Sequence, residues 1–150
     1  MNPRILVEIN IGHNRCGVEA ESADVVELCR EAAQAKHLRF AGVMGYQGHV
    51  VDLEDKQARE TGANECLQRL SDCVARIRDA GIDVEIVSTS ATGDYYISTS
   101  YDVVTEVQAG SYALMDAAYG RLDLGFAHAL SVLTTVTSRP AEDQVITDAG

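Results

Sequence analysis

Hydrophobic and polar residues alternate at the start of the chain in a pattern that predicts a β-strand. Every second residue from Ile5 to Ile11 is a branched aliphatic residue, and this period of two is typical of a strand with one buried face. From Ser22 or Asp24 onward the hydrophobic spacing changes to three and four residues, which predicts a helix that ends near Lys36. Asp24 and Glu27 are spaced as in a capping box, so we expect Asp24 to cap this helix.

Strand and helix patterns continue to alternate through the next seventy residues. A second strand is predicted at Phe40–Tyr46, and a long helical pattern covers Ala58–Ile77 with Gly81 as its C-terminal stop. Two further strands are predicted at Val84–Val87 and Val103–Val107. This alternation indicates an α/β fold in which parallel strands are joined by right-handed helical crossovers.

A different pattern begins after Tyr119–Gly120. Ser131–Thr137 and Gln144–Thr147 are rich in β-branched residues and are separated by Arg139–Pro140. These runs predict strands, and no helical pattern follows that could cover them. We therefore expect a β-rich unit to begin in this part of the chain.

Composition narrows the function to small-molecule chemistry in the cytoplasm. The 150 residues are 46% hydrophobic and 23% charged, which is typical of a globular domain. A net charge of -11 disfavours nucleic acids and anionic membranes as partners. The chain has no apolar run of about 20 residues, the length that spans a bilayer, and its first residues do not resemble a signal peptide.

The cysteines and histidines show no pattern of a metal site. The four cysteines lack CxxC spacing, so reduced thiols are expected, and the seven-residue interval between Cys66 and Cys73 places both on one helix face as core residues. Three histidines lack the i, i+4 spacing of helical metal ligands, so none is assigned to a metal: His13, His37 and His128.

Two strand ends have the composition of phosphate-binding loops. Ser88–Gly93 follows the third predicted strand and Gln108–Ser111 follows the fourth. In parallel α/β barrels the functional residues lie at the carboxyl ends of the strands, where hydroxyl groups and exposed backbone amides can donate to a phosphate. Each cluster alone is also typical of an ordinary Ser/Thr-rich turn.

The first two strand ends offer charged and aromatic groups. Arg15 follows the first strand and could donate to an anionic oxygen, although a surface arginine is equally compatible with its position. Glu8 faces away from the isoleucines, so we expect it to pair with Arg15 rather than remain an isolated carboxylate. Tyr46 and His49 end the second strand with an aromatic ring and a proton carrier. For His49 a solvated structural role stays open.

Taken together and in this order, these motifs resemble the D-threonine aldolase family. That family also contains D-3-hydroxyaspartate aldolases and eukaryotic-type D-serine dehydratases, and it belongs to the alanine-racemase-type (fold type III) enzymes that use pyridoxal 5'-phosphate. The resemblance covers nearly the whole chain and rests on the following segments: Glu8–Val18, Gly45–His49, Ser88–Gly93, Thr105–Tyr112, Met115–Asp116 and Tyr119–Gly120.

The resemblance implies a fragment of a larger enzyme. Residues 1–127 would form the second half of a (β/α)8 TIM-type barrel, like the alanine racemase N-terminal domain, and residues 128–150 would begin a C-terminal β-rich, metal-binding domain. The Schiff-base lysine of the family would then lie upstream of Met1. The divalent-metal ligands, a His-x-Asp or His-x-Cys pair that holds Mn, Mg or Zn, would lie beyond Gly150. The two lysines of this chain, Lys36 and Lys56, lie in polar helical stretches.

The resemblance also implies a role for each pocket residue. Arg15 would lie near the phenolic oxygen of the cofactor, Tyr46 against its ring and Gln108 at its pyridine nitrogen. Asn10 stands where the family often has aspartate. His49 is the one catalytic candidate within this chain. The phosphate would be bound by two loops: Thr89, Ser90, Thr92 and Gly93 in the first, Gly110 and Ser111 in the second.

The implied activity is retro-aldol cleavage of D-threonine-like substrates to glycine and an aldehyde. The alternatives are a D-serine or D-3-hydroxyaspartate dehydratase, an amino-acid racemase and a non-catalytic pyridoxal-phosphate carrier; a phosphate-binding barrel unrelated to pyridoxal phosphate also stays open. Gln108 counts against a racemase, which has arginine at that position, and the β-branched runs from Ser131 count against a carrier. We expect the fragment alone to be inactive, and a homodimeric parent stays open.

Overall fold

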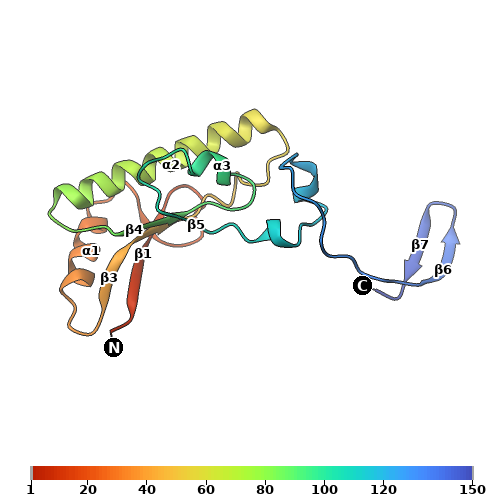
Figure 1. The fold of residues 1–150 in the computed structure, drawn as a ribbon, viewed down its shortest axis with the longest axis horizontal. Helices are drawn as coiled ribbons and strands as arrows, with labels where there is room; N and C mark the ends of the chain where they lie inside the picture. The colour runs from red at the N-terminus through yellow and green to blue at the C-terminus, as the bar shows by residue number, and fades with distance from the viewer. Residues whose placement is uncertain (1, 150) are drawn as a thin grey trace.

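A parallel β-sheet organises the part of the chain that the computed structural model describes, residues 2–149 (Figure 1). Its strand order is β2-β1-β3-β4-β5, and every adjacent pair is parallel. The strand bounds are β1 Arg4–Asn10, β2 Val18–Glu19, β3 Arg39–Gly45, β4 Ile86–Thr89 and β5 Glu106–Val107. The predicted α/β class is confirmed, and β2 is a short strand that the hydrophobic pattern did not reveal.

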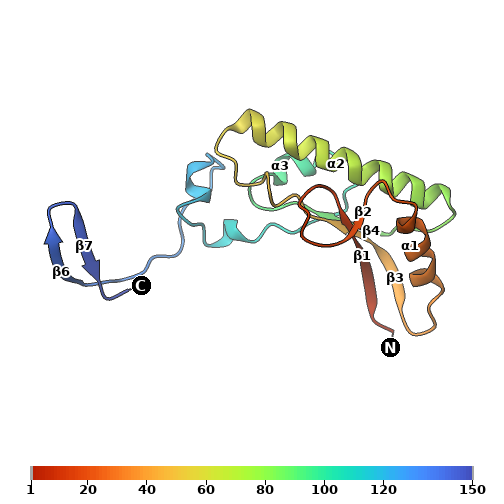
Figure 2. The same cartoon turned by 180° about the vertical axis from the view of Figure 1, so that it is seen from behind.

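Helices connect the successive strands of this sheet from β2 onward, whereas a loop joins β1 to β2. The long helix α2 extends along the sheet in both views (Figures 1 and 2). The helix bounds are α1 Asp24–Gln34, α2 Lys56–Asp79 and α3 Tyr95–Ser98, followed by the 3₁₀ turns η1 Ser111–Ala113 and η2 Tyr119–Arg121. The helix α3 lies between β4 and β5 and was not predicted.

The main hydrophobic core lies between one face of the sheet and the helices α1 and α2. Alternate residues of the strands point into it, as the period of two requires, and meet aliphatic residues and cysteines of the helices. Its fully buried members include Ile9, Val25, Cys29, Val43, Leu70, Cys73, Val74, Ile77 and Val87. The predicted core positions of Cys66 and Cys73 are confirmed.

The predicted C-terminal stop of α2 is confirmed, whereas the predicted N-cap of α1 is not. The N-cap of α1 is Ala23, not the predicted Asp24, and the Asp24 amide donates to Ser22 Oγ over 3.1 Å. The predicted capping box is therefore wrong, because the chain turns into the helix one residue earlier. At the end of α2, Gly81 adopts φ +78° as the predicted stop, a conformation that favours glycine.

The fourth predicted strand is shorter than its hydrophobic pattern. Only Glu106–Val107 forms β5, because Thr105 bonds to Val87 partly through its side chain: the Val87 amide donates to Thr105 Oγ1 over 2.9 Å. The Thr105 amide donates back to the Val87 carbonyl over 3.0 Å. A hydroxyl group thus replaces one backbone partner at Thr105, and the regular ladder begins at Glu106. Val103 and Val104 belong to the preceding turn, in which the Val104 amide donates to the Tyr101 carbonyl over 2.9 Å.

On the other face of the sheet, mostly polar side chains form a row across the strands. Glu8 pairs in register with Met44, Met44 with Ser88, and Ser88 with Glu106. These residues alternate with the core positions, so they lie on the face opposite α1 and α2. The loops that follow these strands all leave from the same edge of the sheet.

The C-terminal residues form an antiparallel hairpin that lies away from the sheet, at the blue end of Figure 1. It consists of β6 Val136–Ala141 and β7 Gln144–Thr147, and all of their residues are exposed. The predicted strand at Gln144–Thr147 is confirmed, whereas the one at Ser131–Thr137 is wrong for its first five residues, because β6 begins only at Val136. The segment Arg139–Pro140, which separates the two predicted runs, lies within β6; a two-stranded ribbon has open edges that accept a proline. The division between residues 127 and 128 stays a prediction.

Candidate functional site

A single cavity of about 320 Å³ brings the loops after β1, β3, β4 and β5 together. Most of the predicted site residues line it: Arg15, Tyr46, Ser90, Thr92, Gln108, Gly110 and Ser111. Met44, Ala91 and Tyr119 complete the lining. Parallel strands place their carboxyl ends at one edge of the sheet, which explains why residues almost a hundred positions apart meet here.

Arg15 is the charged residue of the cavity lining. Its guanidinium carbon lies 4.9 Å from the centre of the Tyr46 ring, a cation–π distance. The guanidinium also donates to Glu8 Oε1 over 3.1 Å, so the predicted Arg15–Glu8 pair is confirmed. Arg15 therefore gives this cavity a positive side, in a chain whose net charge is -11.

The carboxylate of Glu8 is held ionised beside this arginine. A hydrogen bond from the Cys16 thiol lowers the pKa of Glu8, and the hydrogen bond and charge of Arg15 add to this, against the opposing effect of desolvation. An ionised Glu8 keeps Arg15 in place over Tyr46.

The loop after β4 lines the cavity and contains two backbone amides without an acceptor in the described part of the chain. Ser90 and Thr92 are 1% exposed, and Ser90 has φ +77°, the left-handed conformation. Among the hydrogen bonds of residues 2–149, none uses the amide of Thr92 or Gly93 as donor. Two free amides in succession on a tightly turned loop are suited to bind an anion.

The loop after β5 provides a second pair of such donors. The amides of Gly110 and Ser111 likewise donate to no group in the described part of the chain. No atom lies within 4 Å of the position that a Cβ of residue 110 would take, so the backbone is open to a ligand there. The two loops are joined by the Tyr112 amide, which donates to Thr92 Oγ1 over 3.0 Å.

A chain of hydrogen bonds fixes the amide orientation of Gln108. Ser88 Oγ donates to Glu106 Oε1 over 2.6 Å, so it accepts from Gln108 Nε2 over 2.8 Å. A carboxylate accepts only, and this sets the direction of the whole chain. The Oε1 atom of Gln108 remains as an acceptor beside the cavity.

Three predicted site residues do not line the cavity. Thr89 is buried, and its hydroxyl group donates to Gln47 Oε1 over 3.0 Å. Gly93 follows the lining residue Thr92, and a Cβ at this position would collide with the carbonyl oxygen of Val51. Its side-chain position is therefore occupied by another loop, and only its backbone can serve a ligand.

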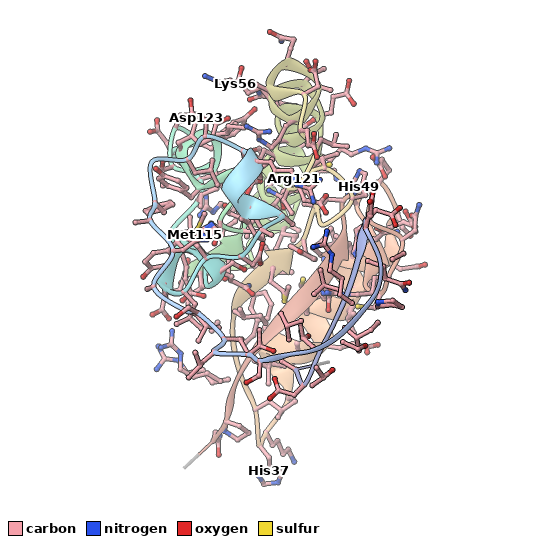
Figure 3. The ribbon with its side chains drawn as sticks, turned by 90° about the vertical axis from the view of Figure 1, so that its right-hand side faces the viewer. His37, His49, Lys56, Met115, Arg121 and Asp123 are labelled. Atoms are coloured by element: carbon pink, nitrogen blue, oxygen red, sulfur yellow. The ribbon has the colours of Figure 1, made fainter. Side chains whose placement is uncertain are left out.

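His49, the third of these residues, is exposed and borders a neighbouring cavity of about 700 Å³. Its ring stacks on His13 at 5.9 Å, and its Nε2 lies 3.9 Å from Cys66 Sγ. Partial desolvation lowers its pKa, as do the charges of His13 and Arg69, so the ring is neutral at neutral pH. Figure 3 shows His49 far from His37, which lies at the bottom end of that view. A catalytic role for His49 stays a prediction.

Sequence reasoning missed two buried residues behind the cavity. Asp94 is fully buried and accepts three hydrogen bonds, from Gln47 Nε2, Ser90 Oγ and the Ala91 amide. Burial raises the pKa of Asp94, and these hydrogen bonds oppose the shift. Gln47 lies within Gly45–His49, one of the segments that carry the family resemblance, but the hydrophobic pattern around Gln47 and Asp94 gives no indication of a site.

Tyr119 was also not predicted as a site residue, although it lies in Tyr119–Gly120, one of the segments that carry the family resemblance. Its phenol lines the cavity, and burial raises its pKa, with smaller contributions from Tyr46 and Asp52. The phenol therefore stays protonated over the physiological range and can donate a hydrogen bond.

Within residues 2–149, no three His, Cys, Asp or Glu side chains are grouped so that they could hold a metal ion. None of the described helices has the length and hydropathy to cross a membrane. The cysteines of the described chain are free thiols; Cys16 is exposed and the other three are buried.

Known enzymes of D-amino-acid metabolism are similar to this chain. It is 35% identical over 150 residues to a D-threonine aldolase of an Arthrobacter species, and 36% identical over 155 residues to a 3-hydroxy-D-aspartate aldolase of Paracoccus denitrificans. These alignments include 97% of this chain but 39% and 40% of the relatives, so the chain spans about two fifths of their length. A D-threo-3-hydroxyaspartate dehydratase of a Delftia species is 28% identical, with 97% and 39% of the two chains covered.

The fold comparison agrees with these similarities. The crystal structure of the D-threonine aldolase from Filomicrobium marinum superposes with a TM-score of 0.89 and 40% identity, over 98% of this chain and 40% of that one. The predicted resemblance to the D-threonine aldolases is confirmed. Residues 1–118 match the family described as alanine racemase, N-terminal domain. The chain therefore belongs to the alanine racemase N-terminal domain family.

Proposed function

We propose that this chain is part of a pyridoxal-phosphate-dependent lyase that cleaves D-3-hydroxy amino acids, such as D-threonine, to glycine and an aldehyde. One observation carries the proposal. A single cavity joins two loops with free backbone amides to Arg15 and Tyr46. The similarity to aldolases of D-threonine and 3-hydroxy-D-aspartate supports the reaction and the substrate class.

The residues present fit pyridoxal phosphate. The amides of Thr92, Gly93, Gly110 and Ser111 provide donors for a phosphate dianion without a lysine or arginine at that end. At the other end Tyr46 offers an aromatic wall and Arg15 a cation for an anionic ring oxygen. When bound, this cofactor withdraws electrons from the amino acid and so weakens the bonds at its α-carbon.

The side chains around the cavity would orient the ligand and control protons. The neutral phenol of Tyr119 can donate a hydrogen bond, so it would favour an unprotonated ligand atom beside it. The Oε1 atom of Gln108 can only accept, so it would favour a protonated ligand atom. The ion pair of Arg15 with Glu8 keeps the guanidinium close to Tyr46, which leaves it positioned to bind rather than free in solvent.

A dehydratase is the second candidate, since such an enzyme is among the relatives. The identity to that enzyme is 28%, against 35% and 36% for the two aldolases, which favours the aldolase reaction. His49 is our candidate for proton transfer within this chain. Its neutral ring could accept a proton, although it lies beside the cavity and not in its lining.

The other parts of the enzyme are proposed to lie in the remaining three fifths of the family length. The cavity lining contains no lysine, so the Schiff-base lysine would come from another segment, as would the ligands of a divalent metal. Residues 128–150 would belong to the metal-binding β domain. We also propose a cytoplasmic parent, in keeping with the free thiols, and a homodimer as its assembly.

The test is expression of the complete reading frame that encodes these 150 residues, hereafter the complete protein. Purified complete protein is mixed with pyridoxal phosphate, a divalent metal and D-threonine, and glycine and acetaldehyde are measured. Equal release of both supports an aldolase, and release of ammonia with a keto acid supports the dehydratase. Absence of cofactor binding in an absorbance titration would contradict the proposal as a whole.

A further inference from the structure

A buried hydrogen-bond network behind the cavity connects the loop that carries Tyr46 to the loop that carries Ser90 and Thr92. Its central residue is Asp94, which has no exposed surface. Gln47 Nε2 donates to Asp94 Oδ2 over 2.5 Å, and Thr89 Oγ1 donates to Gln47 Oε1 over 3.0 Å. Gln47 is also fully buried and follows Tyr46 directly in the chain.

The second carboxylate oxygen of Asp94 accepts hydrogen bonds from the loop after β4. Ser90 Oγ donates to Asp94 Oδ1 over 2.9 Å, and the Ala91 amide donates to the same oxygen over 2.8 Å. Both donors lie at the residues where the backbone turns through the left-handed conformation of Ser90. Such a conformation is unfavourable for a residue with a side chain, so it needs restraint from its surroundings.

The position of Asp94 makes this use of its carboxylate unusual. Asp94 is the N-cap of α3, where an aspartate normally accepts from the amides of the first helical turn. Its side chain makes no such cap bond and turns back to the Ala91 amide. The carboxylate thus stabilises the loop and not the helix, although burial of its charge is unfavourable.

We propose that Asp94 is a positioning residue that sets the affinity of the loop for phosphate, and that Gln47 couples this loop to the loop that carries Tyr46. Asp94 fixes Ser90 and Ala91, and the free amides of Thr92 and Gly93 follow immediately. The proposal rests on the proposed function for the identity of the phosphate, namely that of pyridoxal phosphate. The hydrogen-bond network itself does not depend on that identity, because all of its members lie within this chain.

Substitution of Asp94 separates geometry from charge. Asp94→Ala removes all three acceptor contacts, and we expect affinity for inorganic phosphate and for pyridoxal phosphate to fall by roughly ten- to a hundredfold. Asp94→Asn keeps an oxygen for Ser90 and Ala91, and its amide can donate to Gln47 once the Gln47 amide rotates by half a turn. We expect Asp94→Asn to bind both ligands within about threefold of the original.

Asp55→Ala is the matched control. Asp55 is the N-cap of α2, and its carboxylate accepts from the Ala58 amide over 2.7 Å, outside the cavity. This variant loses a capping bond and some stability but should keep both affinities. Hydrogen exchange of the Ala91 amide gives a readout that needs no ligand: it should rise in Asp94→Ala and stay protected in Asp94→Asn and Asp55→Ala.

The measurements are made on the complete protein, by calorimetric titration with each probe. Unchanged affinity of Asp94→Ala, or an Asp94→Asn variant as weak as Asp94→Ala, would overturn the positioning role. If wild type binds phosphate but not pyridoxal phosphate, the proposed function fails while the phosphate measurements still decide the role of Asp94. Binding of neither probe by wild type overturns both.

If Asp94→Ala does not fold, the proposal can be tested by exchanging the carboxylate and the amide between residues 47 and 94. Gln47→Glu alone places two buried carboxylates opposite each other and should disrupt the loop. Gln47→Glu together with Asp94→Asn restores one acceptor and one donor across the same contact. Recovery of Ala91 protection and of phosphate affinity in the double variant supports the proposal, and failure to recover them overturns it.

Discussion

The two loops that face the cavity with free amides differ in how they are supported. The loop after β4 is buried, and Asp94 bonds to its turn from behind. The loop after β5 is exposed at Gly110 and Ser111 and is joined to the first by the Tyr112 amide. The first loop is therefore preorganised, whereas the second depends on its neighbours and on a ligand for its order. Preorganised donors contribute more to affinity because less order is lost on binding.

The largest expected effect comes from a matched pair of glycine substitutions. Gly93→Ala drives a methyl group into the carbonyl oxygen of Val51, whereas Gly110→Ala meets open space. We expect Gly93→Ala to lower the free energy of unfolding by about 3 kcal/mol, from forced displacement of the loop. Gly110→Ala should change it by less than about 0.5 kcal/mol.

Urea denaturation of the two variants measures this difference, and phosphate titration follows the site. Phosphate affinity should fall roughly a hundredfold in Gly93→Ala, in proportion to the displaced backbone. Equal losses of stability in the two variants would show that the first loop is no more constrained than the second.

Arg15→Ala separates the contribution of the two amide loops to binding from that of the opposite end of the cavity, where Arg15 lies. Arg15 contacts Tyr46 and Glu8, not the loop amides, so its loss should reduce affinity for pyridoxal phosphate by about tenfold and leave that for inorganic phosphate unchanged. Arg39→Ala is the control, since Arg39 pairs with Glu85 at the start of β3. A loss of phosphate affinity in Arg15→Ala would mean that the ligand lies in the other orientation.

Thr92→Val tests the connection between the loops. The variant leaves the Tyr112 amide without its acceptor, which should cost about 1 kcal/mol of stability. We expect the exposed loop to respond more than the buried one, because the buried loop keeps its bonds to Asp94. Faster hydrogen exchange should therefore be seen at Tyr112 and not at Ala91; the reverse pattern would contradict the comparison.

The smallest effect is a pH dependence that belongs to the buried loop. The pKa of Asp94 is raised in the folded state, so folded protein binds its proton more tightly than unfolded protein does. The contribution of Asp94 to stability is therefore largest at acidic pH and declines as the pH rises from about 4, the ordinary carboxyl value, through the raised pKa.

Asp94→Asn lacks this titration and provides the comparison. The free energy of unfolding of Asp94→Asn minus that of wild type should become more positive as the pH rises from about 4 toward neutrality. Urea denaturation at several pH values measures this difference. A constant difference would show that burial does not shift the pKa of Asp94.

Local pattern was sufficient for the regular elements and failed where side chains replace backbone partners. The period of two located β1 and β3, and the helical spacing with Gly81 located α2 and its end. The cap of α1 and the length of β5 were missed, because Ser22 and Thr105 take over hydrogen bonds through their hydroxyl groups. Such exchanges depend on which chains lie nearby, and periodicity carries no information about that.

The candidate site divides in the same way. Ser90, Thr92, Gly110 and Ser111 could be identified because phosphate-type loops have a characteristic composition and strand ends are predictable. Asp94 could not be identified, because an aspartate before a short helix is indistinguishable from an ordinary cap until its carboxylate is seen to face Ala91. His49 was chosen for its chemistry, but the fold places it beside the neighbouring cavity.

The sequence by itself determined the alternation of strands and helices, the two polar strand ends and the family resemblance, since these depend on residues close together in the chain. Only the tertiary structure decided which groups meet. It brought Arg15 over Tyr46, joined the two loops through Thr92 and turned Asp94 away from its helix toward Ser90. Contacts between distant segments follow from the register of the strands and the course of the loops, and both are set by packing of the whole domain.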